Sequence, residues 1–325
     1  MKPASTTLLG ATVLAVALGL SACSGDTDSG GAEESYQIGI TQIVEHPSLD
    51  AAREGFKQAL ADAGLDVSYD EQNAQGDQAT ATSIATTFAG DDLDLVLAIA
   101  TPTAQASAQA ITDVPILITA VTDPVEAGLV DSWEAPGGNI TGTSDINPVD
   151  EQLGLLGDIA PEAQSVGIVY SAGEVNSQIQ VDLARSAAEE LGLQIEEATV
   201  TNSSEVQQAT ESLDVDAYYV PTDNTVVSAL EALMQVAESR SLPVIAAEGD
   251  SVERGALATY GLDYERLGYQ TGEMAVQVLT EGADPAEMPV ETLSELSLIL
   301  NGGTAERIGL ELPAELVESA DTVFE

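Results

Sequence analysis

Carboxylates are numerous in this chain, but no sequence feature pairs two of them, and the side chains form no known catalytic pattern. The one histidine, His46, lies in Glu45-His46-Pro47, and a lone histidine is a weak signal for a general base. Residues 142–146 (GTSDI) lack the last glycine of a G-x-S-x-G nucleophile elbow. No H-E-x-x-H, P-loop or G-x-G-x-x-G motif occurs, and the one cysteine, Cys23, cannot build a cysteine-based metal site or an internal disulfide. We therefore expect no enzyme, no cofactor and no metal site, an expectation that turnover of a bound solute would overturn.

Small polar residues gather instead in six loops that match in pairs between the two halves of the chain. Each loop follows a predicted strand and carries hydroxyl, amide or carboxylate groups. The pairs are 41–48 with 171–177, 100–105 with 221–226, and 120–128 with 246–255. If the edges of two sheets face each other, these loops line one polar cleft.

The chemistry of such a cleft suits a zwitterion. Helix N-termini present free N–H groups to an anion, and the hydroxyls of Thr101 and Thr103, on either side of Pro102, add donors. An ammonium group would find acceptors in four carboxylates, those of Asp123, Glu174, Asp223 and Glu248. An alternative stays open for several of these residues, because Thr101 and Asp223 also suit ordinary helix N-caps and Asp123-Pro124 suits a turn.

The elements that position these loops alternate between strand and helix. Strands are predicted at 36–43, 66–72, 94–100, 115–121, 139–144, 165–171, 193–199, 216–222, 243–247, 257–261 and 293–300. Helices are predicted at 48–63, 77–89, 102–111, 149–160, 175–191, 204–213, 225–240, 264–281, 304–310 and 313–319. This alternation predicts an α/β protein with two doubly wound parallel sheets, one in each of two lobes joined by a hinge.

The N-terminus predicts export and anchoring. Lys2 is followed by an apolar stretch at 8–20, which has the length of a signal-peptide core and is too short to span a membrane. Leu20-Ser21-Ala22-Cys23 resembles the lipobox of bacterial lipoproteins, which implies cleavage before Cys23 and lipidation of its sulfur; a plain secretory signal with a chance cysteine is the alternative. We expect a signal peptide at 1–22, a lipid-anchored flexible tether at 23–35, and an extracytoplasmic location at the cell surface or in the periplasm.

The net charge excludes one class of partner. The chain has 55 acidic and 8 basic residues, a formal net charge of −47. Nucleic-acid binding needs a basic surface, so no nucleic-acid partner is expected. The acidic residues are spread along the chain, which indicates a solvated surface suited to high salt rather than a site for a cationic ligand.

Long stretches of the chain together resemble a known family, the ABC-transporter substrate-binding lipoproteins of the TrpX-like group. The stretches are IGITQIVEHPSLDAAREGFKQAL (38–60), AIATPTAQ (98–105), TDPVEAGLV (122–130), NITGTSD (139–145), VGIVYSAGEVNS (166–177), PTDN (221–224), YGLDYERLGYQTGEMAVQVL (260–279) and LNGGTAERIGLELPAELVESADTV (300–323). The resemblance implies the type I periplasmic-binding-protein fold, with crossovers near 145–149, 262–266 and 284–291. It implies a first lobe of 36–145 with 264–284, a second lobe of 146–263 with 290–301, and a C-terminal helical segment at 302–325.

The resemblance also implies a ligand and a set of binding residues. The expected ligand is an amino acid, with tryptophan, tyrosine and phenylalanine as the leading class. The expected ligand-binding residues are Gln42, His46, Thr101, Thr103, Thr122 and Asp123 in the first lobe, Asp145 at the hinge, and Asn176, Ser177, Asp223, Asn224 and Glu248 in the second lobe. Thr101 and Thr103 would bind the carboxylate. Tyr170 and Tyr260 are candidates for stacking on an aromatic ligand, with a core or rim position as the alternative.

These expectations add up to a solute receptor. The protein would capture a small solute between its lobes as a monomer and deliver it to an ABC permease with its ATPase. A ligand-sensing surface lipoprotein that acts on a receptor instead of a permease is the alternative.

Overall fold

The computed structural model describes residues 35–325, and residues 34–325 form one compact unit. The predicted signal peptide, the lipidation of Cys23 and the tether up to residue 34 lie outside the described residues. Ser35, predicted as the last tether residue, is the first residue of strand β1. Within residues 35–325, no helix has both the length and the apolar content needed to cross a bilayer.

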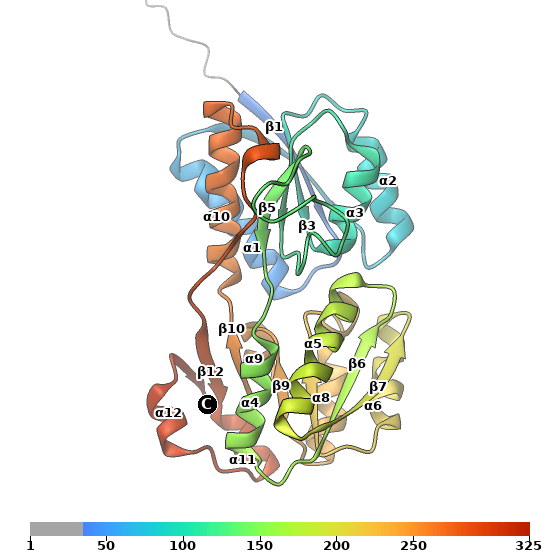
Figure 1. Cartoon of the computed structure of the whole chain (residues 1–325), viewed down its shortest axis with the longest axis vertical. Coiled ribbons are helices and arrows are strands. Elements are labelled where there is room, and N and C mark those ends of the chain that lie inside the picture. The colour runs from blue at the N-terminus through green and yellow to red at the C-terminus, as the bar shows by residue number, and fades with distance from the viewer. Residues whose placement is uncertain (1–34) are drawn as a thin grey trace, which may run out of the picture. The chain divides into compact units, whose positions relative to one another are not determined.

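Two α/β lobes make up the described chain (Figure 1), as the alternation predicts. The first sheet has the strand order β11-β5-β4-β3-β1-β2. Its strands are β1 (Ser35–Gln42), β2 (Asp66–Asn73), β3 (Leu95–Ile99), β4 (Ile116–Thr119), β5 (Ile140–Ser144) and β11 (Glu291–Thr292). Its helices are α1 (Pro47–Asp62), α2 (Gln78–Phe88), α3 (Thr101–Ala110) and α10 (Tyr264–Val276). The sheet is parallel throughout.

The second sheet has seven strands in the order β13-β12-β10-β9-β8-β6-β7. They are β6 (Ser165–Ser171), β7 (Gln194–Val200), β8 (Ala217–Val220), β9 (Val244–Ala246), β10 (Ala258–Gly261), β12 (Ser297–Asn301) and β13 (Thr322–Phe324). Its helices are α4 (Val149–Ile159), α5 (Val175–Leu191), α6 (Val206–Ser212), α7 (Asn224–Val227), α8 (Leu230–Ser239), α9 (Gly249–Glu253), α11 (Gly302–Ile308) and α12 (Ala314–Ser319).

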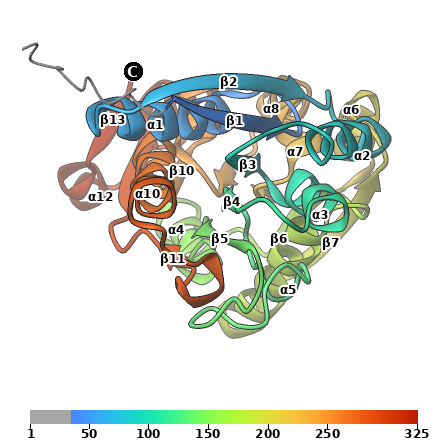
Figure 2. The same cartoon turned by 90° about the horizontal axis from the view of Figure 1, so that it is seen from above.

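Both faces of each sheet are covered by helices, so the central strands are apolar on both sides. In β3, Leu95, Leu97 and Ile99 belong to one core cluster, and Val96 and Ala98 belong to the other. Helices α1 and α10 lie on one side of the sheet, and α2 and α3 lie on the other (Figure 2).

Helices α1 and α10 approach each other closely along a line of glycines. A Cβ atom at Gly268 would lie 1.8 Å from the carbonyl oxygen of Ala52, and one at Gly55 would lie 2.0 Å from that of Glu265. Glycine is therefore required at these positions, because any side chain would collide with backbone. The contact ties α10, which follows the second lobe in sequence, to the first helix of the first lobe.

Three segments connect the lobes, and the third differs from the prediction. The first two lie at 145–148 and 262–263, close to the predicted positions. The third lies at 293–296 instead of 284–291, because β11 pairs with β5 and so keeps residues 291–292 in the first lobe. The assignment of residues 290–292 to the second lobe is therefore wrong.

The end of the chain also differs from the prediction. Residues 302–325 are not a separate helical segment, because β13 pairs with β12 and completes the second sheet. In addition, β12 runs antiparallel to β10 in a sheet that was predicted to be parallel. The reason is topological: β10 ends at the hinge, so the strand that returns from the hinge beside it must run the opposite way.

Candidate functional site

A small cavity lies between the two lobes. The lining comes from the start of α1, the end of β4, the hinge and three segments of the second lobe, which follow β6, β8 and β9. The lining residues are His46, Ser48, Leu49, Ala120, Asp145, Tyr264, Asn176, Thr222, Asn224, Val227 and Glu248.

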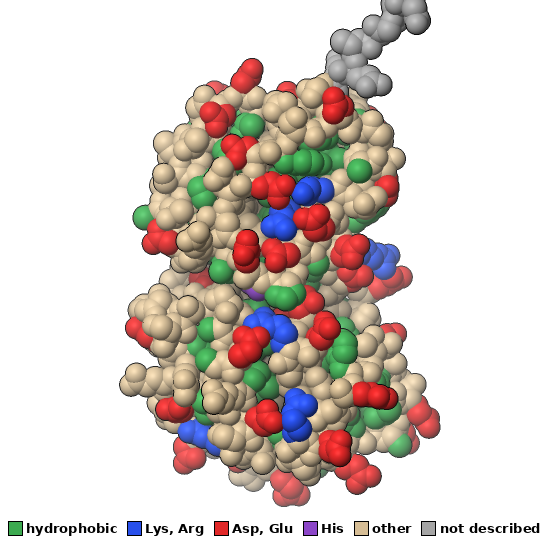
Figure 3. Space-filling view, turned by 180° about the vertical axis from the view of Figure 1, so that it is seen from behind, with side chains coloured by type: hydrophobic (Ala, Val, Ile, Leu, Met, Phe, Trp, Pro, Cys, Tyr) green, Lys and Arg blue, Asp and Glu red, His purple; other side chains and the backbone are tan. Residues whose placement is uncertain are grey.

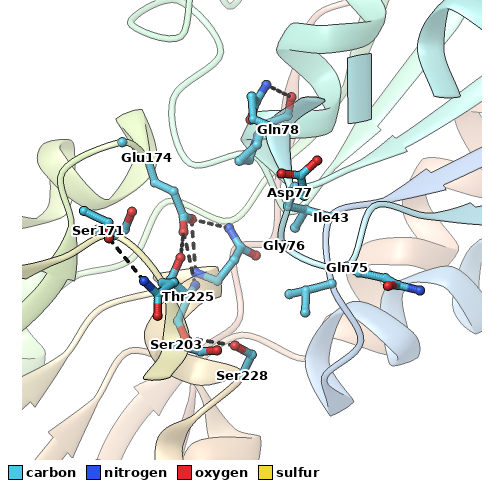
Figure 4. A pocket seen from close by; sticks show the side chains of 16 residues that line it. Ile43, Gln75, Gly76, Asp77, Gln78, Ser171, Glu174, Ser203, Thr225 and Ser228 are labelled. Atoms are coloured by element: carbon cyan, nitrogen blue, oxygen red, sulfur yellow. Dashed lines mark hydrogen bonds between the residues drawn. The ribbon is translucent and has the colours of Figure 1, made fainter. Parts of the chain in front are cut away.

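A wider polar groove opens beside this cavity, also lined by both lobes (Figure 4). It shares Asn224 with the cavity. Glu174 lies in its wall and accepts hydrogen bonds from the N–H groups of Asn224 and Thr225, both at 3.1 Å, so its carboxylate holds the start of α7.

Two hinge residues meet inside the cavity. The hydroxyl of Tyr264 donates to Asp145 Oδ2 at 2.7 Å, and the hydroxyl of Thr122 donates to Asp145 Oδ1 at 3.2 Å. Burial raises the pKa of Asp145, and the two hydrogen bonds partly offset this rise. Asp145 follows β5 in the first connecting segment and Tyr264 follows the second, so this pair joins two of the three connections.

The first turn of α1 contacts the second lobe directly. The hydroxyl of Ser48 donates to Glu248 Oε2 at 2.7 Å, and both residues are buried. Glu248 also caps α9 through the N–H groups of Asp250 and Ser251. Burial raises the pKa of Glu248, with a further rise from the charge of Asp250. The Ser48–Glu248 hydrogen bond exists only while the two lobes are together.

His46 makes a second contact between the lobes. Its ring interacts with the side chain of Asn224, and burial lowers the pKa of His46 to about 4. The imidazole is therefore neutral at pH 7. Its Nδ1 atom is buried and has no hydrogen-bond partner among the described residues.

Asn176 presents an unpaired acceptor to the cavity. Its Nδ2 atom donates to the carbonyl oxygen of Thr222 at 2.9 Å and to Glu174 Oε2 at 3.3 Å. Its Oδ1 atom is buried and has no partner among the described residues. Exchanging the two atoms would place Oδ1 against two other oxygens, so the acceptor must face away from them.

Two of the predicted residues in the first lobe serve the fold instead of the cavity. Gln42 donates to the carbonyl oxygen of Val44 at 2.8 Å and to Asp50 Oδ1 at 2.9 Å, which shapes the loop before α1. Asp123 accepts from the N–H group of Val125 at 2.9 Å, so it shapes a turn, which is the alternative role that the sequence allowed for Asp123-Pro124. Neither residue lines the cavity.

Asp223 and Ser177 are likewise used inside the second lobe. Asp223 accepts from the N–H group of Ser171 at 2.6 Å, the hydroxyl of Ser177 at 2.7 Å and the N–H group of Val226 at 2.8 Å. It is the N-cap of α7, as one alternative predicted. Burial and the neighbouring Glu174 raise the pKa of Asp223 to about 7.

Thr101 and Thr103 differ in what their hydroxyls do at the start of α3. Thr103 donates to the carbonyl oxygens of Ile99 and Ala100 at 2.6 and 2.9 Å, so its proton is not free for a carboxylate. The hydroxyl of Thr101 is buried and has no partner among the described residues. Neither residue lines the cavity itself, although Pro102 lines the outer groove.

The backbone is strained where two strands of the first lobe meet the site. Ala100 has a φ of 78° and Ala120 a φ of 55°, in a region that alanine rarely adopts. Ala120 lines the cavity and Ala100 precedes Thr101. Such strain gathers at functional sites, where the surrounding structure fixes an unusual loop.

Several cavity residues were not predicted as part of the site. Ser48, at the start of the first predicted helix, and Tyr264, at the start of the helix predicted at 264–281, were not named as binding residues. Tyr264 directly follows a strand and a two-residue connection, so the rule that ligand-binding residues follow strands would have found it. The two tyrosines proposed for stacking do not line the cavity: Tyr170 donates to Glu197 at 3.1 Å, and Tyr260 packs against a core cluster of the second lobe.

This chain is similar to known proteins that bind aromatic amino acids. A tyrosine-binding protein of Clostridioides difficile is 45% identical over 316 residues, which cover 92% of this chain and 91% of the relative. An ABC domain from Streptococcus pneumoniae, whose structure was solved in complex with L-Trp, is 36% identical to this chain in sequence. The match covers 90% of this chain and all of the other, and the TM-score between the two structures is 0.87.

A third relative indicates the conformation of the lobes. The ligand-free, open structure of a substrate-binding protein with adhesive properties from Clostridium difficile is 47% identical over 89% of this chain and 99% of that chain, but its TM-score is only 0.67. The L-Trp complex is less similar in sequence and more similar in structure. Together with the direct contacts between the lobes, this indicates that the present structure is the closed form.

The model of one family, ABC transporter substrate binding protein, matches residues 37–324. The match covers nearly the whole described chain, and the relatives above share the two-lobed fold. The resemblance to TrpX-like proteins seen in the sequence is thereby confirmed, and the chain belongs to the family of ABC transporter substrate-binding proteins.

Proposed function

We propose that this protein is the extracytoplasmic receptor of an ABC importer and that its ligand is an aromatic amino acid with a polar side-chain group, tyrosine or tryptophan. The observation that carries the proposal is the small cavity between the lobes, which is lined by polar groups from both of them. The relatives that bind tyrosine and L-Trp support the choice of ligand.

The cavity combines surfaces for both parts of such a ligand. Leu49, Ala120 and Val227 offer apolar contact, and the ring of Tyr264 offers an aromatic face, all suited to the side chain of the amino acid. Asp145 and the Oδ1 atom of Asn176 offer acceptors for the ammonium group. The ligand thus meets the unpaired groups that closure buries.

The carboxylate has donors at the start of α1. This helix begins without a hydrogen bond from a capping side chain, so N–H groups of its first turn remain available. Ser48 and Leu49 bring this first turn to the cavity wall. The start of α3, with the unpaired hydroxyl of Thr101, lies outside the cavity wall.

Transport follows from closure in this proposal. The open form takes up the amino acid, the connecting segments bend, and the closed form presents one combined surface of both lobes to the permease. Cys23 carries the lipid that keeps the monomeric receptor at the membrane. The protein performs no chemistry on its ligand.

Thermal unfolding of the purified full chain in the presence of single amino acids tests the proposal. A ligand that binds only the native state raises the unfolding free energy by about 2.7 kcal/mol at a concentration of 100 Kd. Tyrosine or tryptophan should raise the melting temperature, and acidic, basic and small aliphatic amino acids should leave it unchanged. A shift by another class of solute would contradict the ligand. Uptake of the same labelled amino acid should then be lost in cells that lack this protein, and unchanged uptake would contradict the importer role.

A further inference from the structure

A surface poor in charge crosses the lobe boundary of a chain whose net charge is −47. Of the sixteen residues that line the groove in Figure 4, only Asp77 and Glu174 are charged, and none is basic. Asp77 accepts the N–H and hydroxyl groups of Thr80, each at 2.7 Å, and so caps α2. Glu174 is 7% exposed and holds the start of α7. Both charges are thus bound by groups of their own lobe, and the other lining residues are uncharged.

The uncharged surface continues from the groove onto α2 and α3. Neither helix contains a charged residue, although charged residues make up 19% of the chain. Gln78 at the start of α2 and Pro102 in the first turn of α3 both line the groove, so the surfaces are continuous. Helix α3 also contacts α5 of the second lobe. The exposed side chains of α2 include Thr82, Ser83, Thr86 and Thr87.

Both lobes are needed to form this surface. Gln75 and Gln78 belong to the first lobe, and Ser203 and Thr225 lie opposite them on the second (Figure 4). When the lobes open about their connections, the two sides of the groove move apart. A partner that covers the groove therefore meets the complete surface only in the closed form.

The missing charges indicate the chemistry of such a partner. A partner with basic groups would gain from carboxylates opposite them, and the chain has 55 acidic residues that could supply these. An acidic partner would gain from Lys or Arg, which the groove lacks. The centres of protein interfaces are depleted in charged residues. Uncharged contacts also persist in high salt, where charges are screened within about 3 Å at 1 M.

We propose that the groove and the adjoining starts of α2 and α3 form the surface on which the permease docks, and that this contact is made by uncharged groups on both proteins. The inference rests on the proposed function, because it names the surface by which the same receptor meets its importer. Amide, hydroxyl and apolar groups make the contact, so shape and hydrogen bonds determine recognition. Closure then controls docking because it completes the surface.

Charges of both signs, introduced on each side of the groove, test this inference. The variants are Gln75→Glu and Gln75→Lys in the first lobe and Ser203→Asp and Ser203→Lys in the second. Uptake of the labelled amino acid that the parent protein binds, L-tyrosine or L-tryptophan, is measured in cells that make only the variant. All four variants should lower the initial rate by about 10-fold or more, because a charge buried against an uncharged surface loses its water and gains no partner.

Gln194 provides the matched control. It begins β7, and Thr201 in the groove directly follows the end of the same strand, so Gln194→Glu and Gln194→Lys place the same charges at the opposite end of the strand. Both control variants should keep the parental uptake rate. Calorimetry with the purified full chain should give the parental affinity for the amino acid in all six variants, because none of the three residues lines the cavity.

The outcomes separate the docking surface from the proposed function. Loss of uptake with both signs of charge, at parental ligand affinity and equal amounts of protein in the membrane, supports the inference. The inference fails if one sign lowers uptake and the other raises it, because the partner surface is then charged. It also fails if the four variants keep the parental rate, or if an equal loss of ligand affinity accompanies the loss of uptake. The proposed function fails instead if cells without the protein take up the amino acid as fast as cells with it.

Discussion

Removal of one hydroxyl should open the closed form. In Ser48→Ala, the hydrogen bond of 2.7 Å to Glu248 is lost, and this bond connects the first lobe to the second. The two residues are 1% and 2% exposed in the closed form, whereas in an open form both would face water. The substitution therefore destabilises the closed form and leaves the open form almost unchanged.

The expected magnitude follows from the charge of the acceptor. A hydrogen bond to a charged group contributes about 1.5–3 kcal/mol, which corresponds to about a 10- to 100-fold change in the closing equilibrium. A ligand that is bound mainly in the closed form loses the same factor in affinity. The loss should appear in the dissociation rate, because closure is what retains the ligand.

Calorimetry, stopped-flow dissociation and small-angle scattering check this together. Ser48→Ala should raise Kd, speed release and shift the ligand-free scattering toward the open form. The control is Ser239→Ala, which removes a hydrogen bond of 2.8 Å to the carbonyl oxygen of Val236 within the second lobe and should change none of these. Unchanged affinity in a folded Ser48→Ala protein would show that the bond between the lobes does not contribute to closure.

Three further outcomes are expected. Gly268→Ala forces a Cβ atom to within 1.8 Å of the backbone of Ala52, so it should lower the unfolding free energy measured in urea by about 1–3 kcal/mol. The control Gly154→Ala places its Cβ atom where no other atom lies within 4 Å and should be neutral or slightly stabilising. Equal unfolding free energies of the two variants would refute the close contact of α1 and α10. The pKa of His46 falls from 6.5 to about 4 in the closed form, so protonation of His46 opposes closure. The contribution of neutral His46 to affinity is therefore complete above pH 6.5 and is lost as the pH falls toward 4. Over this range the parent protein should lose more affinity than His46→Gln, and parallel affinity curves for the two proteins would contradict this role of His46. The chain has a net charge of −47, so its acidic side chains repel one another. When salt increases from about 0.1 M to about 1 M, the Debye length falls from about 10 to about 3 Å, and the melting temperature should rise because the repulsion is screened. A melting temperature that does not depend on salt would show that this repulsion does not limit stability.

The fold was predictable from the sequence because its periodic signals are strong. The run LVLAI of β3 is buried on both faces, and only a strand with helices on both sides tolerates such a pattern. The end of the chain was less predictable. The strand β13 is three residues long, and β11 is two, so neither has a period that can be recognised.

The acidic surface was also predictable, and Figure 3 shows acidic side chains spread over both lobes of the face in view, with few basic ones. All seven basic residues of the described chain, Arg53, Lys57, Arg185, Arg240, Arg254, Arg266 and Arg307, already contact a carboxylate or a backbone carbonyl oxygen.

The site was predictable in position and less so in membership. Polar residues after strands do reach the cavity, as His46, Asp145, Asn176, Asn224 and Glu248 show. The same rule fails for residues whose side chain is used by the nearest backbone, because a carboxylate suits an N-cap as well as a ligand. Which hydrogen bonds are already made inside a lobe depends on atomic positions, and these cannot be read from residue types.

The three connections between the lobes determine when each lobe can be completed during synthesis. The first sheet lacks its last strand until residue 292, and α1 lacks its glycine-lined partner α10 until residue 276. The second sheet lacks its last strand until residue 324. An emerging chain therefore completes the first sheet only after most of the second has been made, and completes the second sheet last, unlike proteins whose domains fold one after another from the N-terminus. Until α10 has been made, the apolar side chains of α1, such as Phe56 and Leu60, stay uncovered on one side, so the chain should depend on chaperones up to that point.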